Sequence, residues 1–409
     1  MSSAAGAIWP WLKADLKMPV KKVVIEKANR IYQLPPPLFT SLPPKRDKTL
    51  LKKTDILNFS AFEWDVEAES DITLKSDSLK RASKAKLELL KSELARWFEK
   101  FNGARLDPEK EIFIGGGVRN LILNIGLTFI DRGELVFVPE LGYPHYKRVV
   151  AACGGDDVSY AVSAKSDWLP DFSTLSSSIG RIARLLFLNS PHNPTGAVLS
   201  EKDFAKLFLA ASKENVMIVN DATYQSLSDS RAVSMLSVKG AEKVGVELHS
   251  FSHTFGLPSL PFGFAAGHSE VINGLEQISN LSPEPALNFY CDLALEAIRK
   301  FPSPVLKSVN RKISDSRAEA LKLFDLVELE PKGHNTAPFL WGKIEGRRSS
   351  SIAAKILYHA GKIVAVPGTE FGEGGEGYLR FSLTATQETY DKAIQRIKKR
   401  RRLFKLIEE

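Results

Sequence analysis

The sequence predicts an α/β fold in which a mostly parallel sheet is covered by helices on both faces. Short apolar runs recur through the middle of the chain, and amphipathic segments such as 201–212 separate several of them. Strands that alternate with helices are typical of a parallel sheet that is buried on both sides. A chain of 409 residues, of which 44% are hydrophobic, is also long enough to fill the cores of two or three lobes.

The expected elements follow one another in a clear order. A proline-rich arm, LPPPLFTSLPP, precedes one long amphipathic helix over residues 80–101. The seven strand candidates after it are EIFIGG, ELVFVPE, VSYAV, RLLFLNSP, VMIVND, VELHSFS and FGFAAG. A helical region over about 287–324 then leads to three further strand candidates, APFLWGKI, KIVAVPG and YLRFSL.

These elements divide the chain into three parts. Residues 1–60 are expected to form an N-terminal arm and part of a small domain. Residues 61–300 form the large domain, and residues 301–409 form a smaller α+β domain with a different succession of elements.

The net charge of +8 is concentrated at the C-terminus. Residues 392–409 contain eight Lys or Arg against two Glu, so the rest of the chain is nearly neutral. Apolar residues recur there at steps of three and four, which predicts a closing amphipathic helix with a basic face. That face either meets water or binds an acidic partner, and we expect no nucleic-acid partner.

Composition also limits the compartment and the kind of site. No segment has the uninterrupted apolar length that spans a bilayer, and the N-terminal segment lacks the pattern of a signal peptide, so we expect a cytoplasmic protein without a membrane partner. The two cysteines, Cys153 and Cys291, are isolated in the chain. Neither a disulfide framework nor a metal site is therefore expected.

Polar residues follow the apolar runs where strands are expected to end. Residues 189–196 follow RLLFL, Asp221 follows VMIV, and residues 250–253 follow VEL. Because the carboxyl ends of parallel strands meet at one edge of a sheet, these residues predict a site at that edge. Two simpler interpretations stay open, since a strand-end Asp can cap a helix and Asn193-Pro194 can be a turn.

Six segments in order resemble a known family. They are LDPEKEIFIGGGVRN, FVPELGYPHY, LNSPHNPTG, IVNDATYQSL, SFSHTFGLPSLPFGFAAG and VPGTEFGEGGEGYLRFSL. Over residues 85–385 the chain resembles the class I/II aminotransferases, the aspartate-aminotransferase-like branch of the fold type I pyridoxal phosphate superfamily. The resemblance implies a large domain with a mostly parallel seven-stranded sheet between helices, a smaller α+β domain, and a homodimer.

The resemblance also implies roles for five residues. Asp221 would hold the pyridine nitrogen of the cofactor protonated, which makes the ring an electron sink. Asn193 and Tyr224 would hydrogen-bond the ring hydroxyl, and Tyr143 would stack on the ring face. Arg380 would bind the α-carboxylate of an amino-acid or 2-oxo-acid ligand, although it could instead pair with an acidic neighbour.

The phosphate of the cofactor has fewer expected contacts than in the family. The resemblance implies contacts from Gly117, Val118, Arg119, Ser250 and Ser252. The family arginine is replaced by Pro261, the usual Ser or Thr by Val118, and the partner subunit's tyrosine has no counterpart. A helix N-terminus with one cation can still hold an anion, with lower affinity.

His253 stands at the position of the family's Schiff-base lysine. Histidine can move a proton but has no primary amine for a Schiff base, and no lysine occurs between Lys243 and Lys300. If His253 is a base, its activity should rise with pH through an imidazole pKa near about 6.5. Any pyridoxal phosphate or pyridoxamine phosphate would then be bound noncovalently.

Three functions compete on this basis. The narrowly favoured one is a non-catalytic aminotransferase homologue, because the lysine and the phosphate arginine and tyrosine are lost together. The alternative is an unconventional enzyme that uses His253 as its proton-transfer base, as a small group of sugar dehydratases in the superfamily places histidine at the lysine position. A conventional aminotransferase ranks behind both.

Overall fold

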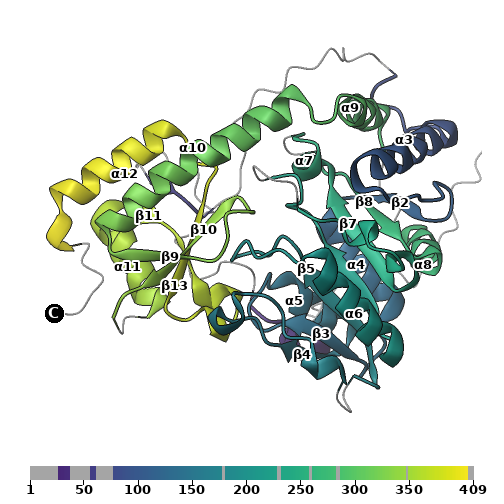
Figure 1. Cartoon of the computed structure of the whole chain (residues 1–409), viewed down its shortest axis with the longest axis horizontal. Coiled ribbons are helices and arrows are strands. Elements are labelled where there is room, and N and C mark those ends of the chain that lie inside the picture. The colour runs from purple at the N-terminus through teal and green to yellow at the C-terminus, as the bar shows by residue number, and fades with distance from the viewer. Residues whose placement is uncertain are drawn as a thin grey trace, which may run out of the picture.

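The computed structural model describes residues 26–36, 56–60, 77–176, 180–227, 232–257, 260–281, 286–346 and 349–403. Two lobes lie side by side, and the long helix α10 (Pro304–Leu326) runs from one to the other (Figure 1). Most of the expected N-terminal arm and the last residues of the basic tail lie outside the described residues. Among the residues described, no helix is long and apolar enough to cross a membrane.

The large lobe is built on one seven-stranded sheet. Its order is β2-β8-β7-β6-β5-β3-β4, and only β8 runs antiparallel to its neighbours. The strands are β2 (Ile112–Gly115), β3 (Leu135–Pro139), β4 (Asp156–Tyr160), β5 (Ala183–Asn189), β6 (Met217–Asp221), β7 (Gly245–Ser250) and β8 (Gly263–Gly267). Each corresponds to one of the seven apolar runs, so the predicted α/β class and mostly parallel sheet are confirmed.

Helices cover both faces of this sheet. One face packs on α4 (Val118–Phe129), α5 (His145–Cys153) and α8 (Ser269–Ser279), and the other on α3 (Lys84–Asn102), α6 (Glu201–Glu214) and α9 (Asn288–Arg299). Along β6, Ile218 lies in the second of these cores and Val219 in the first. Because successive side chains enter opposite cores, both must be apolar, which explains why the strands read as continuous apolar runs.

The helical region predicted over 287–324 is two helices. The segment 301–304 reads FPSP, and its prolines lack the N–H groups that an uninterrupted helix needs. Helix α9 ends at Arg299, and α10 begins afresh with the Ser303 side chain accepting a hydrogen bond from the backbone N–H of Leu306 at 3.1 Å.

The small lobe contains the remaining strands. An antiparallel sheet has the order β12-β13-β10-β9, and β1 (Leu57–Asn58) pairs in parallel with β11 (Ile363–Val364). The sheet strands are β9 (Leu329–Lys332), β10 (Phe339–Ile344), β12 (Val366–Pro367) and β13 (Tyr378–Ser382), and α11 (Ser350–Gly361) and α12 (Gln387–Lys399) pack beside them. The sequence did not predict β9, because Glu and Pro interrupt its apolar pattern.

The predicted closing helix is α12. Arg396 of α12 and Arg400, the residue after its end, contact the end of α11: Arg396 donates to the carbonyl of Gly361 at 2.9 Å, and Arg400 donates to that of Ala360 at 2.8 Å. Positive charge is favourable at a helix C-terminus, so part of the basic tail stabilises the lobe itself.

Candidate active site

The polar residues predicted at the strand ends do come together, at the junction of the two lobes. Asn193 follows β5, Asp221 is the last residue of β6, His253 follows β7, and Arg380 lies in β13 of the small lobe. The Arg380 guanidinium joins the lobes by donating from Nη1 to Oδ1 of Asn193 at 3.0 Å. One buried contact therefore connects residues 187 positions apart.

The Asp221 carboxylate is held from two sides. Its Oδ2 accepts a hydrogen bond from the Tyr146 hydroxyl at 2.8 Å, and its Oδ1 accepts from the hydroxyl and the backbone N–H of Thr223 at 2.5 and 3.1 Å. Burial raises the pKa of Asp221, whereas these hydrogen bonds and its electrostatic interaction with His249 lower it. The residues after Asp221 form a turn rather than a helix, so helix capping does not account for it.

Asn189 ties the ends of β5 and β6 together. Its side chain donates to the Asp221 carbonyl at 2.7 Å and accepts from the backbone N–H of Asn193, also at 2.7 Å. Asn193 therefore lies in a turn, as the simpler interpretation proposed, yet that buried turn also carries its side chain to Arg380. Asn189 belongs to the predicted strand-end segment 189–196, but its pattern indicated no specific role for this side chain.

Arg380 is a cation with almost no exposed surface. Its Nη2 donates to the Ser60 carbonyl at 2.9 Å, and its guanidinium lies 4.3 Å from the ring centroid of Phe339 and 5.0 Å from that of Phe371. Burial lowers the pKa of Arg380 to about 10, so the side chain stays charged at neutral pH. A charged, planar fork in this setting is suited to a carboxylate ligand.

Tyr143 and Arg119 are bound to each other. Arg119 Nε donates to the Tyr143 hydroxyl at 2.6 Å, and the Arg119 carbonyl contacts Nε2 of His145 at 3.1 Å. Arg119 itself is exposed at the start of α4. The one cation predicted near the phosphate is therefore partly engaged by the predicted ring-stacking residue.

The glycine at the start of α4 lies against the beginning of β8. Gly117 has a φ of 93°, and a Cβ atom on Gly263 would lie 2.8 Å from the Gly117 Cα. Pro261 is also close to this glycine, because a Cβ atom on Gly117 would lie 4.0 Å from the Pro261 carbonyl carbon. Pro261, where the resemblance predicts an arginine, therefore lies close to the backbone amides that follow Gly117.

His253 and the two serines form the turn after β7. His253 is half-buried in the short helix α7 (Phe251–Thr254), and its Nδ1 lies 2.9 Å from the Ser250 hydroxyl. The Ser252 hydroxyl donates its hydrogen bond to the Leu260 carbonyl at 2.8 Å, so in this arrangement it does not donate to a phosphate. Burial lowers the pKa of His253 to about 4, which keeps the imidazole neutral at neutral pH.

Tyr224 faces His253 edge to face, with ring centroids 5.7 Å apart. Burial raises the pKa of Tyr224, so its hydroxyl keeps its proton at neutral pH and can donate a hydrogen bond. His253, at the predicted lysine position, and Tyr224, the predicted contact of the ring hydroxyl, are therefore direct neighbours.

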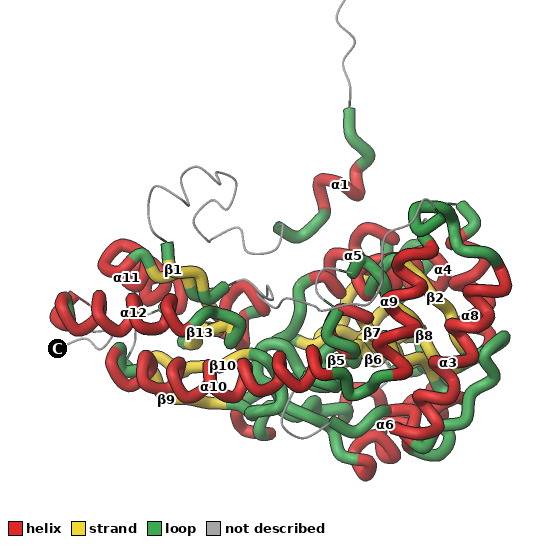
Figure 2. Tube along the Cα trace, turned by 90° about the horizontal axis from the view of Figure 1, so that it is seen from above, coloured by secondary structure: helices red, strands yellow, loops and turns green. Residues whose placement is uncertain are grey.

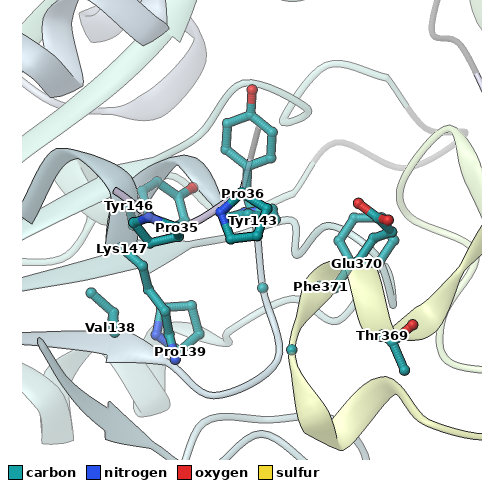
Figure 3. Close-up of a pocket in the computed structure, with 13 residues that line it drawn as sticks. Pro35, Pro36, Val138, Pro139, Tyr143, Tyr146, Lys147, Thr369, Glu370 and Phe371 are labelled. Carbon is teal, nitrogen blue, oxygen red and sulfur yellow. The ribbon is translucent and has the colours of Figure 1, made fainter. Parts of the chain in front are cut away.

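A cavity of about 260 Å³ lies beside Tyr143. Figure 3 shows Tyr143 and Pro36 on one side of it and Glu370 and Phe371 of the small lobe on the other. The described part of the N-terminal arm reaches this cavity through Pro35 and Pro36, and Arg148 donates to the Pro35 carbonyl. The cavity is lined by Pro35, Pro36, Val138, Pro139, Gly142, Tyr143, Pro144, Tyr146, Lys147, Thr369, Glu370, Phe371 and Gly372.

Lys147 is the lysine of this cavity. Its Nζ lies 3.1 Å from the Ser159 hydroxyl and 3.5 Å from the Asp157 carboxylate, both in β4. In Figure 3 its side chain runs past Pro139, away from the Tyr143 hydroxyl. Lys147 therefore does not present its amine at the position of His253.

The residues present fit one end of pyridoxal phosphate better than the other. A protonated pyridine with its hydroxyl suits the groups described above: the Asp221 carboxylate, the Tyr224 phenol, the Asn193 amide and the Tyr143 ring. The phosphate end offers the amides at the start of α4 and the Ser250 hydroxyl, with Arg119 as the cation nearest to them in the chain. Within the described ranges, no group of three or more His, Cys, Asp or Glu could hold a metal ion.

Comparison with known proteins decides the family. The aminotransferase class I and II family matches residues 56–397. The chain belongs to this family. It is 28% identical over 385 residues to the LL-diaminopimelate aminotransferase of Moorella thermoacetica, which covers 92% of this chain and 98% of that protein.

Two further proteins are similar to this chain over nearly its whole length. The LL-diaminopimelate aminotransferase of Halothermothrix orenii is 29% identical over 385 residues, with 91% of this chain and 98% of that protein covered. The substrate-bound structure of BacF from Bacillus subtilis superposes with a TM-score of 0.82 at 21% identity, covering 92% and 98% of the two chains. Pyridoxal phosphate is the cofactor that this family implies.

These findings correct the favoured functional prediction. A non-catalytic homologue was inferred from the lost lysine and phosphate contacts, but the similar proteins of matching length are named as aminotransferases. Asn193 and Asp221, which the resemblance places beside the cofactor ring, lie at neighbouring strand ends, and the buried Arg380 binds Asn193. We therefore treat the chain as an enzyme.

Proposed function

We propose that this protein is an aminotransferase that moves an amino group between an amino acid and a 2-oxo acid with pyridoxal phosphate as its cofactor. The observation that carries the proposal is the convergence of the fixed Asp221 carboxylate, the Asn193 turn and the buried Arg380 guanidinium at the lobe junction. The names of the similar proteins make LL-diaminopimelate the first amino acid to test.

Each residue of the site has a distinct task in this proposal. Asp221 keeps a proton on the pyridine nitrogen, which gives the bound cofactor its capacity to accept electrons. Tyr224 and Asn193 hydrogen-bond the ring hydroxyl, and Tyr143 packs against the ring face. Arg380 binds the substrate carboxylate and so orients the carbon that loses or gains a proton.

His253 takes the proton-transfer role. It has no primary amine, so the cofactor is held noncovalently as pyridoxal phosphate or pyridoxamine phosphate, and neutral His253 accepts or donates the proton at the reacting carbon. Because burial lowers the pKa of His253 to about 4, the ring is in its neutral, proton-accepting form at neutral pH, and it is a weaker base than a free imidazole.

The phosphate site is the weaker part of the proposed pocket. One lost charge-assisted contact costs about 1.5–3 kcal/mol, which weakens binding about 10- to 150-fold. Such a loss reduces affinity without preventing binding, since the amides at the start of α4 still favour an anion.

Single-turnover absorbance tests the function. The purified protein, loaded with pyridoxamine phosphate and mixed with a panel of 2-oxo acids, should convert the cofactor to its aldehyde form and release the matching amino acid. The reverse reaction is tested with pyridoxal phosphate and LL-diaminopimelate. No binding of either cofactor form at high micromolar concentration would refute the proposal.

The rate should depend on pH through His253. Since burial lowers the pKa of His253 to about 4, the base is neutral above roughly pH 5 and the rate should be level there. Below pH 4 the rate should fall about tenfold per pH unit, because protonated imidazole cannot accept a proton. Circular dichroism at each pH controls for unfolding, and a fall centred near 6.5 would show that burial does not perturb this imidazole.

We also propose that the protein is a homodimer. Helix α1 (Asn29–Gln33) buries none of its residues, and it exposes 47% of Ile31 and 68% of Tyr32. Figure 2 shows α1 projecting above α5, which it contacts. A second copy that covers these two side chains would remove them from water.

Light scattering measures the assembly. The wild type should have the mass of two chains at micromolar concentration, and Ile31→Glu/Tyr32→Glu should shift it toward one chain. Leu209→Glu, at a residue that is 76% exposed on α6, serves as the control and should leave the mass unchanged. A monomeric wild type would rule out the dimer.

A further inference from the structure

Two ionisable side chains lie side by side inside the large lobe, away from the pocket itself. Glu247 and His249 both belong to β7, and neither exposes any surface. Glu247 Oε1 lies 2.8 Å from His249 Nε2. Burying such a pair is costly, and apolar residues of similar volume often serve a core equally well.

Glu247 joins three segments around the site. Its carboxylate accepts from the Ser234 hydroxyl at 2.8 Å, from the Met235 backbone N–H at 2.5 Å and from the Asn220 side chain at 3.4 Å. Asn220 is the residue before Asp221 in β6. The carboxylate therefore fixes the strand end that presents Asp221.

His249 extends the connection to the other side of the site. Its ring stacks on Phe264 at 4.8 Å between centroids, and the rings of Trp97 and Phe98 meet it edge-on. Its Nδ1 lies 3.5 Å from the hydroxyl of Thr254, the neighbour of His253 in α7. One buried pair thus reaches the residues next to both Asp221 and His253.

The pair also acts on Asp221 through charge. Burial raises the pKa of the Asp221 carboxyl, and its electrostatic interaction with His249 opposes that rise. A carboxylate that stays ionised is what a protonated pyridine nitrogen requires. The hydrogen bonds of Glu247 and the electrostatic interaction of His249 therefore both act on Asp221, the first on its position and the second on its carboxylate.

We propose that Glu247 and His249 are positioning residues of the active site, which hold the ends of β6 and β7 in register and so place Asp221 and His253. The proposal rests on the proposed function, because its purpose is to prepare Asp221 and His253 for the cofactor. Neither residue touches the cofactor or the substrate in this role. A pair that served the core alone would be replaceable by apolar residues without effect on the site.

The decisive variant is Glu247→Leu/His249→Phe. It fills the same space without charge but takes the acceptor away from the Met235 N–H and the Ser234 hydroxyl, so the melting temperature should fall moderately. Binding of pyridoxamine phosphate, followed by fluorescence titration, should nevertheless weaken by about tenfold or more. At saturation, the absorption of the bound ligand should shift toward that of the unprotonated pyridine.

A matched variant separates positioning from stability. Leu323→Ala empties part of the small-lobe core, where Leu323 is 1% exposed, so it should lower the melting temperature but keep the wild-type dissociation constant and spectrum. The single variant Glu247→Leu leaves His249 buried without its carboxylate and should lose both stability and affinity.

A second readout needs no ligand. With ¹³C-labelled histidine, the ring resonance of His253, assigned with His253→Gln, should move in Glu247→Leu/His249→Phe and stay in place in Leu323→Ala. An unmoved His253 resonance, or wild-type affinity and spectrum in the double variant, would show that the pair serves only the core. If the wild type binds no cofactor, the proposed function fails, while the resonance still decides the positioning role.

Discussion

Replacing Asp221 with Asn is expected to lower the transamination rate by about 10²–10³-fold, the loss typical of a removed electrostatic contact in an active site. Asn matches the shape of Asp but carries no charge to keep a proton on the pyridine nitrogen. The unprotonated ring is a poorer electron sink, so the step that removes the substrate proton slows. Single-turnover absorbance with pyridoxamine phosphate and a reactive 2-oxo acid measures the loss.

Tyr146→Phe is the control for this variant. It keeps the Asp221 charge and removes only the 2.8 Å hydrogen bond from the tyrosine hydroxyl. A hydrogen bond to a charged group contributes about 1.5–3 kcal/mol, and the Asp221 charge and its bonds from Thr223 remain, so the rate should fall less than in Asp221→Asn. Equal losses in the two variants would mean that Asp221 acts by hydrogen bonding rather than by charge.

The large-lobe sheet was predictable because burial on both faces leaves a local signal. Each strand needs apolar residues at consecutive positions, and such runs are visible without knowledge of the partners. The short strand β9 gives no such signal, since its pairing with β10 is decided by the surrounding small lobe. The break between α9 and α10 was present in the sequence as FPSP, but the helical spacing on either side concealed it.

The site was predictable where a strand end coincides with a polar residue. Asn193, Asp221 and His253 satisfy that condition, and the sheet brings them together. Tyr146 lies in helix α5 and not at a strand end, and its hydrogen bond to Asp221 joins residues 75 positions apart, so the sequence did not predict it. Glu247 and His249 were also missed: they lie within an apolar run, and only the side chains packed around them show that they are paired.

The structure also changes what can be expected of His253. An ordinary imidazole would lose half of its activity near pH 6.5, within the physiological range, as a pKa of about 6.5 implies. Burial beside Tyr224 lowers the pKa of His253 to about 4, so the imidazole is neutral at neutral pH, as the proposed proton acceptor must be.

Replacing His253 with Ala should abolish turnover while the dissociation constant for pyridoxamine phosphate changes little. The imidazole is the proposed proton carrier, and general acid–base catalysis of this kind contributes about 10²–10⁴-fold. The ring contacts of the cofactor come from Asp221, Asn193 and Tyr224 in this proposal, so affinity should be largely retained. Turnover that survives in His253→Ala would show that another group moves the proton.

Introducing the lysine and the arginine that the resemblance predicts also tests the role of residue 253. His253→Lys/Pro261→Arg supplies an amine for a covalent bond to pyridoxal phosphate and a cation for its phosphate, so a borohydride-stable adduct should appear at residue 253. The wild type, treated identically, should give no adduct within residues 250–267, because that segment contains no lysine. Peptide mass mapping distinguishes the two. An adduct at Lys147 in the wild type would overturn the noncovalent proposal, since it would show that the lysine bound to Ser159 can turn into the pocket.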